Sequence, residues 1–186
     1  MAIILAGVHT SDQHFSRLIS SPGDYRPSHC LHCNRSCLWC HGFYTRLAGC
    51  ESNAGPLLMP RYRCAYCGKT CSVLPEFAAP KRWFHWATQQ VALTLLLSGL
   101  SYHAVLDILH ERLEHPPSRS TLQRWWARFR GDQSVAQFIL CDAFPTLGLA
   151  QSLTDFWSRC LSQWRLSSVM VRLFRAQAQG HAKLCY

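Results

Sequence analysis

Two Cys-x-x-Cys pairs, about thirty residues apart, have a spacing that suits metal chemistry. Cys30 and Cys33 form the first pair, and Cys64 and Cys67 form the second. Four thiolates from two such pairs can hold one tetrahedral zinc ion. Gly68 directly follows the second pair, where a chain that folds back around a metal needs a residue that tolerates positive φ. The spacing therefore predicts a zinc site with these four cysteines as its ligands.

Further cysteines lie close to these pairs along the chain. Cys37 and Cys40, with His41 after them, form a third pair, and Cys71 lies four residues beyond the second pair. A second metal, or the replacement of one main ligand, is the alternative role for these side chains. We expect Cys37 and Cys40 to be bystanders and Cys71 to be a small buried side chain. Free or disulfide-bonded cysteines are the alternative to a metal, but the odd total of 11 favours metal in a reducing compartment.

The elements that must position the four cysteines are predicted to be short strands. Residues 39–46 and 61–63 have an aromatic and β-branched character, and residues 52–56 between them have the composition of a turn. Hairpins that carry a metal are the layout of a zinc ribbon, which we place at residues 29–80. Since so small a module lacks a large core, the metal would be its main source of stability. We expect residues 1–28 to be a leader that packs on the ribbon and starts with a short buried strand.

From residue 81 the hydrophobic period becomes helical. Gly99 suits the end of a first helix, and Ser101 is the candidate N-cap of a second helix over 102–113. Pro116 and Pro117 end that helix, and Ser118 caps a third. The pattern predicts a helix-turn-helix region over residues 81–130.

The third helix has two distinct faces. Leu122, Trp125, Trp126 and Phe129 recur at i, i+3, i+4 and i+7 and form one apolar stripe. Small, hydrogen-bonding and basic residues turn away from this stripe, as in a helix that enters the major groove of DNA. The alternative is an ordinary solvated face. The predicted DNA-binding residues of this helix are Arg119, Ser120, Thr121, Gln123, Arg124 and Arg128.

The charge balance suits a polyanionic partner. The 186 residues carry 19 Lys and Arg against 10 Asp and Glu, a net charge of +9. Arginine predominates, and its planar guanidinium suits phosphates and guanine edges. We expect the ribbon to contact the DNA backbone through Arg46, Arg61, Arg63 and Lys69.

Residues 131–186 are predicted to form helices over 133–141 and 151–175, which serve as core or as a partner or oligomer interface.

We expect no catalytic activity. The chain has no phosphate-cradling glycine loop and no nucleophile elbow. Asp107, Asp142 and Asp155 could be imagined as a two-metal nuclease triad, but no strand-rich nuclease core surrounds them.

No apolar run reaches the roughly 18 residues of a membrane span, and the first residues lack the basic region of a signal peptide. A soluble cytoplasmic protein is the expectation.

Several segments carry a family resemblance. Residues 25–33, 41–46, 61–70 and 74–77 resemble a family of small bacterial zinc-ribbon proteins found with transposases and other mobile-element genes. The resemblance covers about residues 24–80 and implies that the four paired cysteines bind zinc. Similar ribbons precede helix-turn-helix segments in insertion-sequence transposases, whose catalytic domain this chain lacks.

The expected fold is therefore α+β, with a small N-terminal zinc ribbon of short β-hairpins followed by a mainly α-helical helix-turn-helix region. The expected function is that of a zinc-dependent accessory protein that binds double-stranded DNA beside a transposase or recombinase. Two alternatives stay open. One is a protein-interaction adaptor that uses the zinc module and the Trp-rich helices, and the other is a non-autonomous transposase fragment.

Overall fold

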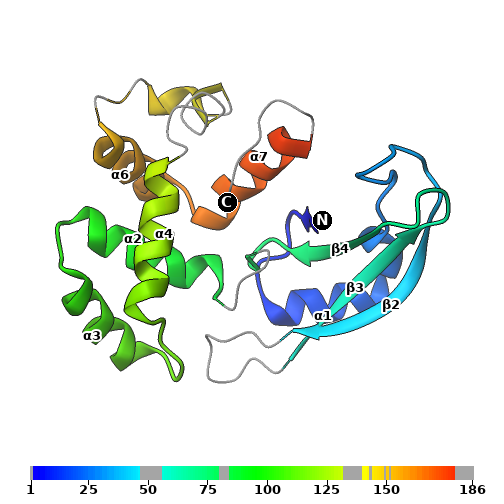
Figure 1. The fold of residues 1–186 in the computed structure, drawn as a ribbon, viewed down its shortest axis with the longest axis horizontal. Helices are drawn as coiled ribbons and strands as arrows, with labels where there is room; N and C mark the ends of the chain where they lie inside the picture. Colours follow the sequence, from blue (N-terminus) through cyan, green and yellow to red (C-terminus); the bar gives the residue numbers. More distant parts are fainter. Residues whose placement is uncertain are drawn as a thin grey trace. The chain divides into compact units, whose positions relative to one another are not determined.

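The computed structural model describes residues 2–46, 56–79, 84–131, 140–142, 144–148, 150 and 152–178. The chain is a mixed α+β protein, which confirms the expected fold class (Figure 1). It divides into two compact units, each described by itself. The described residues up to 79 form the first, here called the strand unit, and those from 84 onward form the helical unit.

The strand unit is built on a four-stranded sheet in the order β1-β4-β3-β2. Its strands are β1 (Ala2–Leu5), β2 (Leu38–Arg46), β3 (Leu57–Cys64) and β4 (Thr70–Pro75). β2, β3 and β4 pair antiparallel, whereas β1 pairs parallel with β4. The short N-terminal strand that was expected is β1, which forms one edge of the same sheet, but its residues are half-buried and not buried. The predicted turn residues 52–55 lie outside the described residues.

Helix α1 (Ser11–Ser20) and the short 3-10 helix η1 (Pro22–Tyr25) follow β1. The Thr10 side chain caps α1 by accepting a hydrogen bond from the Gln13 amide. His14 is fully buried: its Nε2 donates to the Leu58 carbonyl at 2.9 Å, and its Nδ1 lies 2.7 Å from the Tyr25 hydroxyl. Burial lowers the pKa of His14, which favours the neutral form of its ring. These bonds tie α1 and η1 to β3.

Two apolar clusters hold the sheet. One joins Leu38, Tyr62 and Val73 to Tyr25 of η1, with Leu18 of α1 packed against them. The other joins Leu57, Met59 and Leu74 to Ala78, which follows β4. Successive side chains along a strand point to opposite faces of a sheet, so the two clusters lie on opposite faces of this sheet.

The helical unit contains α2 (Trp86–Leu97), α3 (Tyr102–Arg112) and α4 (Arg119–Gly131), which contact one another pairwise. η2 (Pro145–Leu147), α6 (Leu153–Gln163) and α7 (Leu166–Ala178) follow. α2 also contacts α6 and α7, so it is enclosed by helices.

The predicted helix boundaries are confirmed at three positions. Gly99 has φ of +90° just beyond α2. The Ser101 hydroxyl accepts from the Ala104 amide at 3.2 Å and caps α3. The Ser118 hydroxyl accepts from the Thr121 amide at 3.3 Å at the start of α4. Local capping chemistry therefore sets these ends.

The single helix predicted over 151–175 is wrong. The chain leaves the helical conformation at Trp164, where φ is −131° and ψ is 152°. The Trp164 ring stacks on Phe144 at 4.3 Å between centroids, and the Leu166 amide donates to the Gln90 side chain of α2 at 2.8 Å. The Gln90 oxygen thus takes the place of the backbone acceptor that the Leu166 amide would have in a continuous helix. The predicted helix over 133–141 falls mostly on residues 133–139, which lie outside the described residues. Within the described ranges, no helix is long and apolar enough to cross a membrane.

Candidate metal centre

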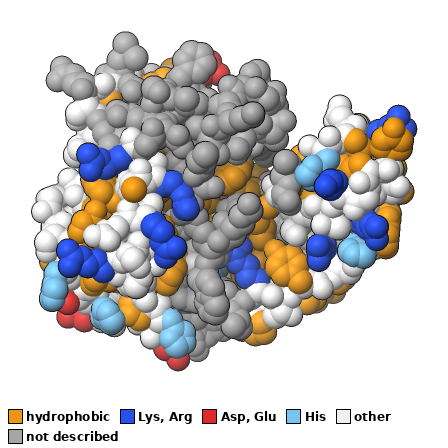
Figure 2. Space-filling model, in the orientation of Figure 1, with side chains coloured by type: hydrophobic (Ala, Val, Ile, Leu, Met, Phe, Trp, Pro, Cys, Tyr) orange, Lys and Arg blue, Asp and Glu red, His pale blue; other side chains and the backbone are white. Residues whose placement is uncertain are grey.

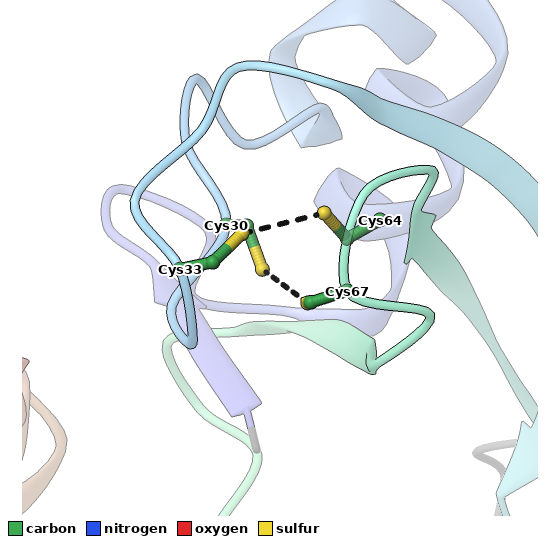
Figure 3. A group of neighbouring side chains, drawn as sticks. All are labelled: Cys30, Cys33, Cys64 and Cys67. Carbon is green, nitrogen blue, oxygen red and sulfur yellow. Dashed lines mark hydrogen bonds between the residues drawn. The ribbon is translucent and has the colours of Figure 1, made fainter.

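The four paired cysteines lie together at one end of the strand unit (Figure 3). Cys30 and Cys33 lie in the turn before β2, whereas Cys64 is the last residue of β3 and Cys67 lies in the turn between β3 and β4. All four Sγ atoms lie within 4.8 Å of one another. The Cys30–Cys67 and the Cys33–Cys64 Sγ distances are both 3.6 Å. A tetrahedral ion with bonds of about 2.3 Å to sulfur separates its ligands by about 3.8 Å, so the cluster can hold a metal ion.

The two cysteine pairs lie in turns that have the same backbone hydrogen bonds. We call these turns, residues 30–35 and 64–69, the two knuckles. In the first, the Asn34 amide donates to the Cys30 carbonyl at 2.8 Å and the Cys30 amide to the Arg35 carbonyl at 2.9 Å. In the second, the Gly68 amide donates to the Cys64 carbonyl at 3.0 Å and the Cys64 amide donates to the Lys69 carbonyl at 2.9 Å. Each turn therefore presents its two sulfurs from a fixed frame.

A residue with positive φ follows each pair. Gly68 has φ of +69°, as its position in the sequence predicted. Asn34 has φ of +56° and is the only described residue other than glycine with positive φ. Asparagine adopts this conformation more readily than most side chains. An asparagine directly after the first pair, at the offset that Gly68 has after the second, is the sequence signal that could have predicted this turn.

Backbone amides and the closeness of the sulfurs set the proton affinity of the thiols. The backbone hydrogen bond from Cys67 is the largest cause that lowers the pKa of Cys64, to about 6. The His32 amide, 3.4 Å from the Cys30 sulfur, likewise lowers the pKa of Cys30. The Arg35 amide acts to lower the pKa of Cys33, but desolvation and the neighbouring sulfurs raise it to about 12. Without a cation the four sulfurs cannot all ionise together, whereas a dication would replace the remaining protons.

Strand pairing holds the second knuckle against β2. Cys64 is opposite Leu38 in the register, and the Ala65 amide donates to the Cys37 carbonyl at 2.9 Å. Arg26 donates from Nη2 to the Leu38 carbonyl at 2.7 Å. Cys30 and Cys64 are buried, while Cys33 and Cys67 are half-buried. The cysteine positions are thus set by the sheet as well as by the turns.

The remaining cysteines differ in their distance from this group. Cys71 is buried in the core on β4, as expected, and Cys40 is exposed on β2. Cys37 lies closer than expected of a bystander, because its Sγ is 3.3 Å from that of Cys64. Cys37 is not among the four sulfurs that lie within 4.8 Å of one another. His41 is exposed and packs edge-on against Trp39 at 5.1 Å between ring centroids.

The predicted DNA-binding residues fall in both units. Arg61, Arg63 and Lys69 are exposed in the strand unit. Arg46 is half-buried and donates from Nη2 to the Ala79 carbonyl, so its guanidinium holds the chain after β4 against the sheet. Those of the helical unit all lie on α4, where Arg119, Ser120, Gln123 and Arg124 are exposed and Thr121 and Arg128 are half-buried.

Substitutions at the positive-φ positions of the knuckles should differ in their effect on stability, depending on whether the new residue tolerates positive φ. Gly68→Asn and Asn34→Gly should each change the free energy of unfolding by less than about 1 kcal/mol, because both residues tolerate positive φ. Gly68→Val should destabilise the strand unit by more than about 1–2 kcal/mol and weaken metal binding. A Cβ at Gly68 would meet only the Arg63 side chain at 3.9 Å, so the expected effect comes from the backbone conformation and not from a clash of the Cβ. Denaturant unfolding with a metal-release titration measures both quantities, and equal effects of Gly68→Asn and Gly68→Val would contradict the argument.

No family model, curated protein or solved structure matches this chain. The resemblance of residues 24–80 to the zinc-ribbon family stays a prediction.

Proposed function

We propose that this protein is a zinc-dependent DNA-binding protein, with a zinc ribbon in its strand unit and a helix-turn-helix element in its helical unit. The zinc site is inferred from the four cysteine sulfurs, which lie within 4.8 Å of one another. Four thiolates in a closed set are the ligands of structural zinc. A site with no open coordination position supplies stability and not Lewis-acid chemistry, in keeping with a protein without catalytic activity.

The geometry of α4 supports the DNA-binding role. Leu122, Trp125 and Phe129 are buried, and Leu122 and Trp125 pack in one cluster with Val105 and Leu109 of α3. This burial turns the opposite side of α4 outward. That side carries arginines and hydrogen-bonding side chains, and no acidic residue occurs anywhere between Arg119 and Gly131. Such a face suits phosphates and base edges.

The connection between α3 and α4 is longer than in most helix-turn-helix proteins. Residues 113–118 separate the two helices, whereas the usual turn has three or four residues. Pro116 and Pro117 lie in this connection. Packing against α2 and α3, and not a tight turn, therefore holds α4 in place.

The resemblance of residues 24–80 supports an accessory role beside a transposase or recombinase, such as recognition of DNA ends. The adaptor alternative depends on the Trp-rich C-terminal helices as an interface. However, Phe156, Trp157 and Leu161 of α6 are buried, and Trp157 Nε1 donates to the Phe129 carbonyl at 3.0 Å. These side chains form the core of the helical unit, which favours the DNA-binding proposal.

The test of this proposal is the loss of duplex binding in Arg124→Ala/Arg128→Ala. Arg124 is exposed and reaches back to the Thr121 hydroxyl at 3.1 Å, so its guanidinium is held near the surface of α4. We expect each phosphate contact that is lost to reduce the salt slope of duplex binding by about 0.9. A lost base contact should instead cost about 1–3 kcal/mol at one position of the site. Binding titrations at several salt concentrations separate the two cases.

Arg159→Ala is the control, because it removes an exposed arginine of the helical unit that does not lie on α4. Arg159 lies on α6 and pairs with Asp155 at 2.8 Å. This variant should bind duplex DNA as the parent does. If the α4 double variant, folded by circular dichroism, also binds as the parent does, α4 is not the recognition element.

A further inference from the structure

The strand unit exposes an unusual number of large apolar side chains. Every large hydrophobic side chain that is exposed among the described residues belongs to this unit, and three of them are on β2. They are Phe15, Ile19, Trp39, Phe43, Tyr44, Leu58 and Tyr66. Figure 2 shows basic and histidine side chains interleaved with hydrophobic ones over this unit. Exposed aromatic rings beside arginines suit a ligand that combines a flat ring with negative charge.

The pairing register places one of these aromatic residues beside two arginines. Trp39 of β2 is opposite Arg63 of β3, and Arg63 is opposite Thr70 of β4. Arg61 is opposite Gly42 on one side and Ser72 on the other. Residues that pair across strands, or lie two apart along one strand, share a face of the sheet. We call this surface, made by Trp39, Arg61, Arg63, Thr70 and Ser72, the Trp39 face.

The Trp39 face is open at the end of the sheet nearest the cysteines. Trp39 is 44% exposed, with the His41 ring edge-on to it at 5.1 Å between centroids, and both arginines are exposed. Gly42 has no side chain to cover Arg61, whose Nη2 donates to the Thr70 hydroxyl at 3.1 Å. Farther from the cysteines the same face is covered, because Met59 and Leu74 pack against Ala78. On the opposite face, Leu18 of α1 and Tyr25 of η1 cover the sheet.

The charge around this face is almost entirely of one sign. Between Asp24 and Glu76 the chain has six lysine or arginine residues and one acidic residue, Glu51. Arg61 and Arg63 are two residues apart on one strand, a separation of about 6.8 Å along its axis. This spacing is comparable to that of neighbouring phosphates in an extended single strand. A duplex keeps its bases stacked inside and offers no free ring face to an indole.

We propose that the Trp39 face binds single-stranded nucleic acid, with an unpaired base stacked on the Trp39 indole and the adjacent phosphates paired with Arg61 and Arg63. Aromatic platforms flanked by basic side chains recognise single strands in this way, since every base has a π-face. The inference rests on the proposed DNA-binding function and names the ligand of the strand unit. Strand separation at a DNA end would supply such a ligand.

The test measures binding of the zinc-loaded full chain to a labelled oligo-deoxythymidine and to a labelled duplex by fluorescence anisotropy. Trp39→Ala should weaken binding of the single strand about 5- to 150-fold. Trp39→Phe should retain most of the affinity, because it keeps an aromatic face. Arg61→Gln and Arg63→Gln should each reduce the salt slope for the single strand by about 0.7.

Helix α1 offers matched controls in the same unit. Phe15 is 36% exposed, and Arg17 pairs with Asp24 at 2.8 Å. Phe15→Ala and Arg17→Gln remove an exposed ring and a charge away from the Trp39 face, so they should bind the single strand as the parent does. Zinc content and the melting transition establish folding, and Trp39→Leu replaces Trp39→Ala if that variant does not fold.

The outcomes separate this inference from the proposed function. If the parent binds the duplex through α4 but not the single strand, or if Trp39→Ala and Phe15→Ala weaken single-strand binding equally, the inference is wrong and the function stands. If the single strand binds through Trp39 but the duplex does not bind, the inference stands and the role of α4 is wrong. Trp39-dependent binding to anionic phospholipid vesicles without binding to the oligonucleotide would also overturn it.

Discussion

Cys64→Ser is expected to remove the bound zinc and unfold the strand unit. Cys64 is 0% exposed, and its sulfur lies 3.6 Å from Cys33 and 3.3 Å from Cys37. Structural zinc contributes about 10–16 kcal/mol of apparent binding free energy, as much as the whole stability of a typical domain. A serine hydroxyl at this position cannot replace the thiolate. Metal analysis of the purified variant and its near-ultraviolet circular dichroism measure the two losses.

Two other cysteines provide the controls. Cys40→Ser changes an exposed thiol on β2 and should leave one zinc per chain and an unchanged melting transition. Cys71→Ser changes a buried thiol that lies outside the four-sulfur group, so it should destabilise the unit but keep the metal. Full zinc content in Cys64→Ser would contradict the assignment. The double variant Cys37→Ser/Cys64→Ser would then show whether Cys37 had replaced the lost ligand.

The knuckles show which parts of the candidate site could be predicted from the sequence. The four cysteines and Gly68 follow local rules of spacing and backbone conformation, and the structure places them together. The role of Asn34 was not predicted, although it occupies in the first knuckle the position that Gly68 occupies in the second. The closeness of Cys37 to Cys64 could not be predicted from the sequence, because it depends on how β2 pairs with β3.

Long-range pairing explains what the sequence could not predict about the sheet. The N-terminal strand was expected, but its parallel partner β4 starts at Thr70, far along the chain. A hydrophobic pattern indicates that a segment forms a strand and does not identify the strand with which it pairs. The same holds for Trp39 and Arg63, whose shared face follows from the register of β2 and β3.

The helices divide in the same way. Ser101, Ser118 and Gly99 were predicted as boundaries because capping is local. The break at Trp164 was not predicted because neither glycine nor proline marks it. Its cause is a pair of contacts from other parts of the unit, the ring of Phe144 and the side chain of Gln90. Similarly, the helical pattern placed Trp125 and Trp126 on one stripe but did not separate their burial.

That difference in burial leads to the second large expected effect. Trp125→Ala should destabilise the helical unit by about 3–5 kcal/mol, the usual cost of removing a large buried aromatic side chain. Trp125 is 3% exposed and packs edge-on against Phe84 at 5.3 Å between ring centroids. It also lies in the cluster that joins α4 to α2 and α3. Alanine would leave a cavity where the indole joins α4 to α2 and α3, and thermal or denaturant unfolding of the full chain measures the loss.

Trp126→Ala is the matched control, because it removes the same side chain from the next position of the same helix. Trp126 is half-buried and is not a member of the buried cluster. A partly exposed ring has less apolar area to return to water, so its loss should cost less than half as much as that of Trp125. If both variants melt as the parent does, the stripe does not support the helical unit and is free to bind a partner. Equal large losses would instead place both rings in the core and leave α4 with a narrower outward face than the DNA-binding proposal requires.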